Sequence, residues 1–310
     1  MSAPTVTTPA PSTTLAASNP AATTLTPLRW RALEASHARR ADEYTADHRR
    51  RRSRHETHPV QDFLFTYYPT KPAQLRRWHP GVGVTLLDAP ERASARWYTR
   101  GHVPGSAVVD VAVYLEQRRD TVVYVHDLLG ATRSRPGQFG CFGLHEWAMV
   151  YRQDPAQVRH RSTPLRLGSE GTDSVVESHQ LRCTHFDAYR FFTPEALGRN
   201  AEPLSRADQP AREQPGCLHA GMDVFKWATK LGPVVPGELL LDTFELAWDI
   251  RELDMRASPY DLTDWGYEPV PIETAAGKAT YVAAQRAFAE RSDALRVRLL
   301  EVTGAVLHGA

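Results

Sequence analysis

The chain has 310 residues, of which 42% are hydrophobic and 24% are charged, so it is long and apolar enough to bury a core. Its formal net charge is +1, which argues against a protein that coats nucleic acid through an overall cationic field and leaves room only for a local basic patch. Three widely spaced cysteines argue against a disulfide framework, and no apolar run reaches the roughly 18 residues of a membrane span, so we expect a cytoplasmic protein without a membrane partner.

The first 26 residues contain no charged residue and consist largely of Thr, Ala, Pro and Ser. Such a segment buries too little apolar surface to offset the entropy lost on ordering, so we expect it to be disordered. Residues 27–310 are expected to form a single compact, mainly α-helical domain with a few short strands, of the kind that enzymes adopt.

Hydrophobic periodicity places the secondary structure along this domain. The first helix is expected from Leu28 to about Arg54, and it is strongly basic. Its arginines either form a solvated face or contact phosphate, and the candidates for phosphate are Arg49, Arg50, Arg51 and Arg52. Further helices are expected over residues 60–68, 71–78, 110–129, 142–152, 172–178, 217–231, 238–255 and 273–302, with strands at 84–87 and 165–167 and a loop at 196–215.

Two motifs place an imidazole beside a carboxylate in apolar helices. His145 and Glu146 are adjacent, so they point about 100° apart, and one can face a cavity while the other meets a partner. A hydrogen-bonded core histidine beside a surface glutamate is the alternative. His219 and Asp223 are four residues apart on one helical face, which suits a general base, a metal ligand or a helix-stabilising polar pair.

A third motif lies in an aromatic run from Cys183 to Phe192. In an extended backbone Cys183, His185 and Asp187 share one face, which suits a metal ligand set or a general-base pair. If Thr184 instead caps a helix, Asp187 is the acid of a capping box. The prediction that unites the three motifs is one pocket lined by His145, Glu146, His185, Asp187, His219 and Asp223, because one shared polar network costs less than three separate buried pairs.

No standard metal motif is present, so no cofactor is assigned. If a metal is bound, His145, His185 and His219 are the first ligands to test. Near the end of the helix over 238–255, Asp254 and Arg256 are placed at the mouth of a pocket.

Six segments, taken together, resemble a group of actinobacterial proteins labelled 3-methyladenine DNA glycosylase, and the resemblance covers nearly the whole chain after residue 26. They are His58–Tyr68, Trp78–Gly81, Cys141–Trp147, Cys183–Phe192, Cys217–Asp223 and Asp254–Asp261. The resemblance implies a DNA-repair hydrolase that excises an alkylated base by cleaving its N-glycosidic bond.

That chemistry needs a flipped base held between aromatic rings and a carboxylate that orients water. Glu146, Asp187 or Asp223 are the candidate carboxylates. The candidate rings are Tyr67, Tyr68, Trp78, Trp147 and Trp227. The main alternative is a small-molecule enzyme, metal-dependent or not, that uses the same histidines. The second alternative is a non-enzymatic ligand-binding protein in which His145 and His219 pack separately.

Overall fold

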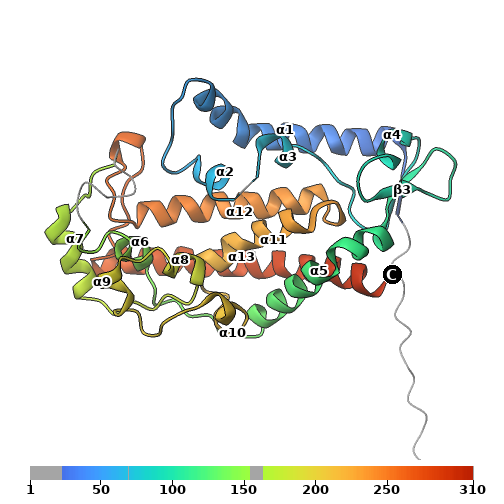
Figure 1. Cartoon of the computed structure of the whole chain (residues 1–310). Helices are drawn as coiled ribbons and strands as arrows, with labels where there is room; N and C mark the ends of the chain where they lie inside the picture. Colours follow the sequence, from blue (N-terminus) through green and yellow to red (C-terminus); the bar gives the residue numbers. More distant parts are fainter. Residues whose placement is uncertain (1–22, 69, 154–162, 310) are drawn as a thin grey trace, which may run out of the picture.

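Three helices from the C-terminal half lie at the centre of the fold (Figure 1). They are α11 (Leu218–Leu231), α12 (Gly237–Arg256) and α13 (Ala275–His308). α11 and α12 are joined by a tight turn and pack closely on each other, and α13 contacts both. A fourth long helix, α5 (Val111–Arg133), packs against α13. The computed structural model describes residues 23–68, 70–153 and 163–309, and these residues form the mainly helical domain that the sequence predicts.

α1 (Pro27–Ser53) forms an outer layer against α12 and begins with a proline at its first position, where no amide hydrogen is needed. Figure 1 shows it running along the top of the central helices. Its buried side chains recur at intervals of three, four or seven residues, which are one or two helical turns, as expected for a helix with one covered face. They are Trp30, His37, Ala41, Thr45 and His48.

A small sheet lies at the α4 end of this layer (Figure 1). Its strands are β1 (Thr23–Leu25), β2 (Val84–Leu86), β3 (Tyr98–Arg100) and β4 (Ala107–Val109), in the order β1-β2-β4-β3. β1 is parallel to β2, and the other pairs are antiparallel. The boundary expected for the disordered tail is therefore wrong at its end, because Thr23–Leu25 pair with β2; residues 1–22 lie outside the described part of the chain.

Short helices connect these elements. They are α2 (Phe63–Tyr67), α3 (Pro72–Leu75), α4 (Pro90–Ala93), α6 (Leu144–Ala148), α7 (Gly168–Glu177), α8 (Phe186–Tyr189), α9 (Pro194–Leu197) and α10 (Gln209–Arg212). Of these, α3 lies beside α1 and α4 beside the sheet, whereas α6 to α10 lie across the central helices from α1 (Figure 1). No helix among the described residues is both long and apolar enough to cross a bilayer.

Several expected elements differ in extent from the observed ones. The helix expected over 142–152 covers only Leu144–Ala148, because Gly143 enters with a positive φ and a turn follows Met149. The strand expected at 165–167 is only an isolated bridge between Leu165 and Tyr260. The loop expected at 196–215 contains α10, which has a proline near its start.

Candidate functional site

The six residues expected to share one pocket come together from three parts of the chain. Two lie on α6, two at the start of α8 and two on the first half of α11, and five of the six are buried. A continuous series of polar and ring contacts joins them, and three further charged residues complete it. The nine members of this polar network are His145, Glu146, His185, Asp187, His219, Asp223, Lys226, Arg251 and Asp254.

One half of the polar network is centred on Asp223. Its carboxylate receives the Tyr68 hydroxyl at 3.0 Å, lies 3.2 Å from Nε2 of His185 and accepts from Nζ of Lys226 at 2.6 Å. The same Nζ lies 3.1 Å from Asp187. Lys226 therefore bridges two carboxylates and offsets the cost of burying Asp223.

The other half is centred on Asp254, at the C-terminal end of α12. Nε2 of His145 lies 3.1 Å from one oxygen of Asp254, and the Arg251 guanidinium lies 3.4 Å from the other. Arg251 also donates to Glu146 at 3.0 Å and covers the Phe63 ring at 3.8 Å. Glu146 is thus buried and ion-paired, which contradicts the alternative of a surface glutamate.

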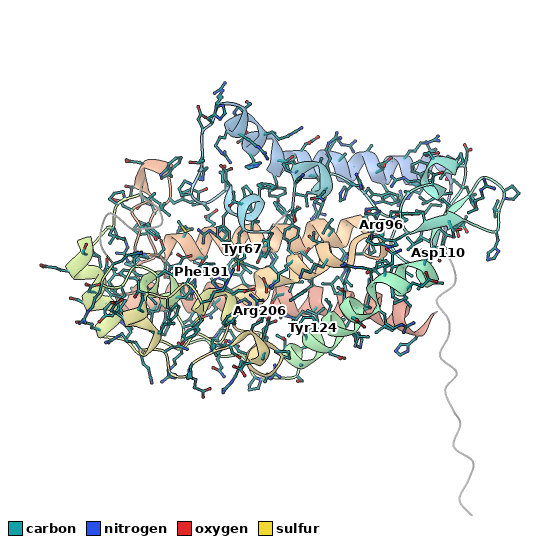
Figure 2. The ribbon with its side chains drawn as sticks, in the orientation of Figure 1. Tyr67, Arg96, Asp110, Tyr124, Phe191 and Arg206 are labelled. Carbon is teal, nitrogen blue, oxygen red and sulfur yellow. The ribbon has the colours of Figure 1, made fainter. Side chains whose placement is uncertain are left out.

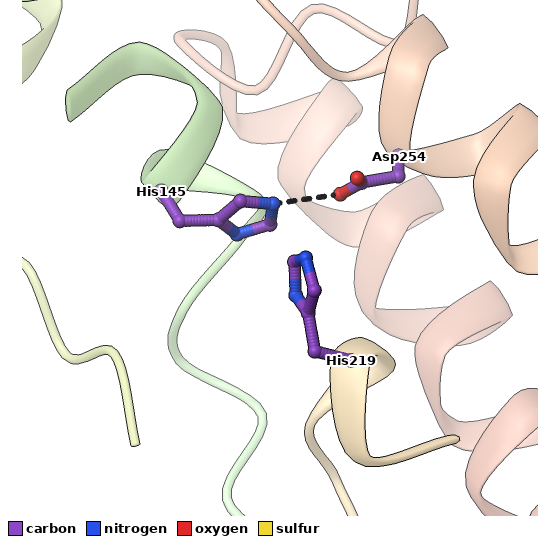
Figure 3. Close-up of side chains that lie close together, drawn as sticks. All are labelled: His145, His219 and Asp254. Carbon is purple, nitrogen blue, oxygen red and sulfur yellow. Dashed lines mark ion pairs between the residues drawn. The ribbon is translucent and has the colours of Figure 1, made fainter. Parts of the chain in front are cut away.

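His219 joins the two halves. Its ring centroid lies 4.4 Å from that of His145, nearly perpendicular to it, and 5.5 Å from that of His185, nearly parallel. Figure 3 shows His145, His219 and Asp254 directed toward one another from three helices. The separate packing of His145 and His219 that a simple binding protein would need is therefore not observed.

The pKa values of the three histidines are shifted in different directions by their surroundings. Burial and the neighbouring His145 lower the pKa of His219 to about 3, so its imidazole is neutral and keeps a lone pair. Burial opposes the charged form of His145, but Asp254 outweighs it and raises the pKa. Asp223 acts in the same way on His185 and raises its pKa. The site therefore combines one neutral imidazole with two that are held by carboxylates.

An open cavity of about 560 Å³ lies over this network. Its wall contains the rings of Phe63, Tyr67, Tyr68 and Phe191, and His219 reaches it from α11. Two carboxylates and five cations also line it: Glu146, Asp187, Arg190, Arg206, Lys226, Lys230 and Arg251. Tyr67, Phe191 and Arg206 are labelled near one another in Figure 2. The cavity thus suits a ligand with a flat ring and an anionic group.

A second, enclosed cavity lies behind His145 and His219. Its volume of about 20 Å³ has room for about one water molecule. All three cysteines line it, together with Tyr281 and Gln214. The cysteines are free thiols, and burial raises the pKa of each above its ordinary value, so they are neutral.

The expected ring residues fall into two classes. Tyr67 and Tyr68 line the open cavity. Trp78 and Trp147 are core residues whose indole N–H groups donate to Glu238 and to the Ala257 carbonyl, respectively. Trp227 is also buried and lies behind the cavity wall, where Lys226 and Lys230 cover its ring at 4.6 and 5.1 Å.

The expected charged residues also separate. Asp254 belongs to the polar network, whereas Arg256 points outward and pairs with Glu252 on the same helix. On α1, Arg49 pairs with Asp42, Arg50 with Asp47 and Arg51 with Asp62, and none of the four arginines from Arg49 to Arg52 lines the cavity. Three of the four are therefore ion-paired within the protein, and the cations at the cavity come from other elements.

The pairing of His219 with Asp223 is wrong, and of the two alternatives for the third motif the capping box is not observed. Asp223 contacts His185 and Lys226 rather than His219, because its side chain turns toward α8. Thr184 caps no helix, since α8 starts one residue later with His185 at its N-cap and no side-chain cap bond. Extended backbone at His185 instead lets its ring reach Asp223.

Lys226 and Arg251 are the functional candidates that the sequence interpretation missed. A local signal exists for each, because Lys226 lies three residues after Asp223 and Arg251 lies three residues before Asp254, on the same helical faces. Each also pairs with a carboxylate from a distant segment, Lys226 with Asp187 and Arg251 with Glu146, and these pairs could not be predicted from local spacing.

Two groups of side chains have the composition of metal sites. His145, His219 and Asp254 form one, and His185, Glu213 and Asp223 form the other; in each, the potential ligand atoms lie within 4.8 Å of one another. The three histidines considered as a ligand set are thus divided between two groups. Comparisons with protein-family models, curated proteins and solved structures gave no match to this chain.

Proposed function

We propose that the protein hydrolyses the N-glycosidic bond of an alkylated purine of the 3-methyladenine type in DNA. The observation that carries this proposal is the meeting, in one cavity of about 560 Å³, of aromatic rings, a carboxylate and exposed cations. The resemblance of the motif set to the glycosylase-labelled group supports the same reaction. A volume between roughly 300 and 1,000 Å³ suits a purine base with part of its sugar.

We assign the cavity rings to a flat cationic base, which would pack against this aromatic wall and not between Phe63 and Tyr67, since those two rings stack on each other. Phe63 and Tyr67 lie parallel, with centroids 5.0 Å apart and planes inclined by 11°. Tyr68 meets Tyr67 edge to face at 4.9 Å. The faces of such rings attract a cation, and an alkylated purine carries positive charge until its glycosidic bond breaks.

Glu146 is the carboxylate that we assign to the sugar. It lies on the cavity wall and is held in place by Arg251, whereas Asp187 is already shared by Lys226, Arg190 and Arg206. In the proposed step, water bonds to the anomeric carbon and gives its proton to the carboxylate. The carbon–nitrogen bond breaks, and its electron pair leaves with the base, which becomes neutral.

Cations at the rim are suited to the phosphates that flank the base. The side chains of Arg190 and Arg206 are 41% and 62% exposed, and Lys230 lines the same cavity. They replace Arg49 to Arg52 as the expected phosphate contacts, because they line the cavity and none of those four does. Binding through the rim should weaken steeply as salt rises.

The test is release of 3-methyladenine from methylated duplex DNA. We expect wild-type protein to release the base and Glu146→Gln to lose the activity without loss of fold. Arg190→Ser and Arg206→Ser should each raise KM about tenfold, the loss of roughly one phosphate contact, while Arg49→Ser and Arg50→Ser serve as matched controls on α1. Release by none of the proteins, or equal effects at the rim and on α1, would overturn the proposal.

A second candidate is an enzyme for a small anionic molecule with a flat ring. The internal neutralisation of the α1 arginines favours it, because a DNA-binding surface would use them free. This second candidate predicts activity on a free nucleoside monophosphate, with no requirement for a DNA duplex. The same base-release assay, run with methylated nucleotide in place of duplex, separates the two.

A further inference from the structure

We propose that His145, His219 and Asp254 bind one divalent transition-metal ion, through two imidazole nitrogens and one carboxylate oxygen. The three side chains come from α6, α11 and α12, and their potential ligand atoms lie within 4.8 Å of one another. This inference goes beyond the proposed hydrolysis and does not rest on it, because it concerns binding of the ion alone.

The first support is the orientation of the atoms. Nε2 of His145 and Oδ1 of Asp254 lie 3.1 Å apart and are both buried, yet neither has a partner in hydrogen-bond geometry among the described residues. Among the described residues, the His219 imidazole has no side-chain hydrogen bond either. Ligand atoms bound tetrahedrally to Zn²⁺ at about 2.1 Å lie about 3.4 Å apart, which is close to the observed 3.1 Å. Buried polar atoms that lie at this spacing without being aligned for a hydrogen bond are explained by a shared ion.

The second observation is that Arg251 fixes the orientation of the Asp254 carboxylate. Arg251 contacts Oδ2 of Asp254 at 3.4 Å and leaves Oδ1 to the histidines. A charged partner on the outer oxygen fixes the direction of the inner one, as the partners of metal ligands usually do. Figure 3 shows both imidazoles directed toward that inner oxygen.

The second candidate group fails the same comparison. In it, Asp223 already accepts from Lys226 at 2.6 Å and from Tyr68 at 3.0 Å, and Glu213 accepts from Gln209 at 2.8 Å. An ammonium group therefore occupies the position that a cation would take. The two groups resemble each other in composition, but in the second the His185 nitrogen beside the carboxylates, Nε2, is hydrogen-bonded to Asp223, and its unpaired nitrogen is Nδ1.

The ligand types restrict the metal. Two imidazoles and one carboxylate suit Zn²⁺, Fe²⁺ and related first-row ions, whereas Mg²⁺ and Ca²⁺ prefer oxygen ligands. Three protein ligands leave at least one coordination position open. His219 lines the open cavity and the small one behind it, and His145 lines the small one, so a ligand in that position would come from one of these two cavities.

The test is titration of chelator-treated, full-length protein with Co²⁺, followed by visible absorption and by X-ray absorption at the cobalt edge. We expect one ion per chain, with imidazole nitrogen and oxygen ligands and no sulfur. His219→Ala and Asp254→Asn should each weaken binding at least about 100-fold, since each removes a direct ligand and loss of an outer partner alone costs 10- to 100-fold. His48→Asn is the control, because His48 is also buried beside a carboxylate, Asp62.

No Co²⁺ binding by the wild type would overturn the proposal, as would affinity that is unchanged in His219→Ala and Asp254→Asn. Sulfur in the wild-type X-ray spectrum would place the ion among Cys141, Cys183 and Cys217 and would also overturn it. Because this spectrum is recorded on the wild type, it identifies the ligands even if a variant fails to fold. No substrate is present, so the outcome is separate from that of the base-release assay.

Discussion

Arg251 is the residue whose replacement tests most directly whether the polar network stabilises the fold. Its side chain is 2% exposed and contacts both Glu146 and Asp254. We expect Arg251→Met to destabilise the protein by about 3 kcal/mol. Removing one partner of a buried ion pair costs about 3–5 kcal/mol, and loss of the arginine's own unpaired Nε and Nη2 donors offsets about 1 kcal/mol.

A second substitution, Glu146→Gln, should change the stability in opposite directions in the presence and in the absence of Arg251. In the wild type the substitution should destabilise the protein by about 1 kcal/mol, because Arg251 then faces a neutral amide. In the Arg251→Met background it should stabilise by a similar amount, because Glu146 is then a buried charge without its cation. The cycle therefore yields two effects of opposite sign for the same substitution.

Equilibrium unfolding in urea, followed by circular dichroism at pH 7, measures all four proteins. Arg256→Met is the matched control on the same helix: its partner Glu252 lies 3.3 Å away at the surface, and the loss should stay below about 1 kcal/mol. An Arg251→Met protein within about 1 kcal/mol of the wild type would refute the reasoning. So would a Glu146→Gln effect of the same sign in both backgrounds.

Two further predictions concern stability away from the network. Gly277→Ala should destabilise the protein by about 1–3 kcal/mol, because the added Cβ would meet the Pro271 carbonyl. Gly304→Ala, on the same helix, adds a Cβ that meets nothing within 4 Å and should stabilise the protein by about 0.5–1 kcal/mol. The urea midpoints of the two variants should shift in opposite directions. Burial lowers the pKa of His79 to about 4, against about 6.5 in the unfolded chain. The contribution of the neutral ring to stability is therefore complete above about pH 6.5 and is lost as the pH falls toward 4. Over that range the wild type should lose about 2 kcal/mol more stability than His79→Gln, and parallel pH profiles of the two proteins would contradict the prediction.

Local patterns predicted the central helices well. α11, α12 and α13 follow from long periodic stretches with clear starts, such as the Pro236-Gly237 pair before α12. The three-residue strands β3 and β4 were not predicted, because so few residues show no alternation. Their pairing depends on register between separate segments rather than on either segment alone.

The candidate site was predicted as a group but not in its pairings. The cost of burying three imidazole–carboxylate motifs separately predicted one pocket lined by all six residues. The structure joins them in one polar network, but only Glu146, Asp187 and His219 line the open cavity. The partners themselves could not be predicted, since Asp254 meets His145 and Asp223 meets His185 across long sequence separations. Spacing along a helix reports which residues share a face and says nothing about which distant element covers that face.

The long sequence separations within the polar network have a consequence for how the chain folds. Tyr68 and Asp223 are 155 residues apart, and Glu146 and Arg251 are 105 apart. Contacts of this kind need the intervening loops to close first, so they form late, after the helices have docked. Substitutions in the network should then leave the rate of folding nearly unchanged and speed unfolding instead. The lifetime of the native molecule, more than its rate of formation, depends on these buried charges.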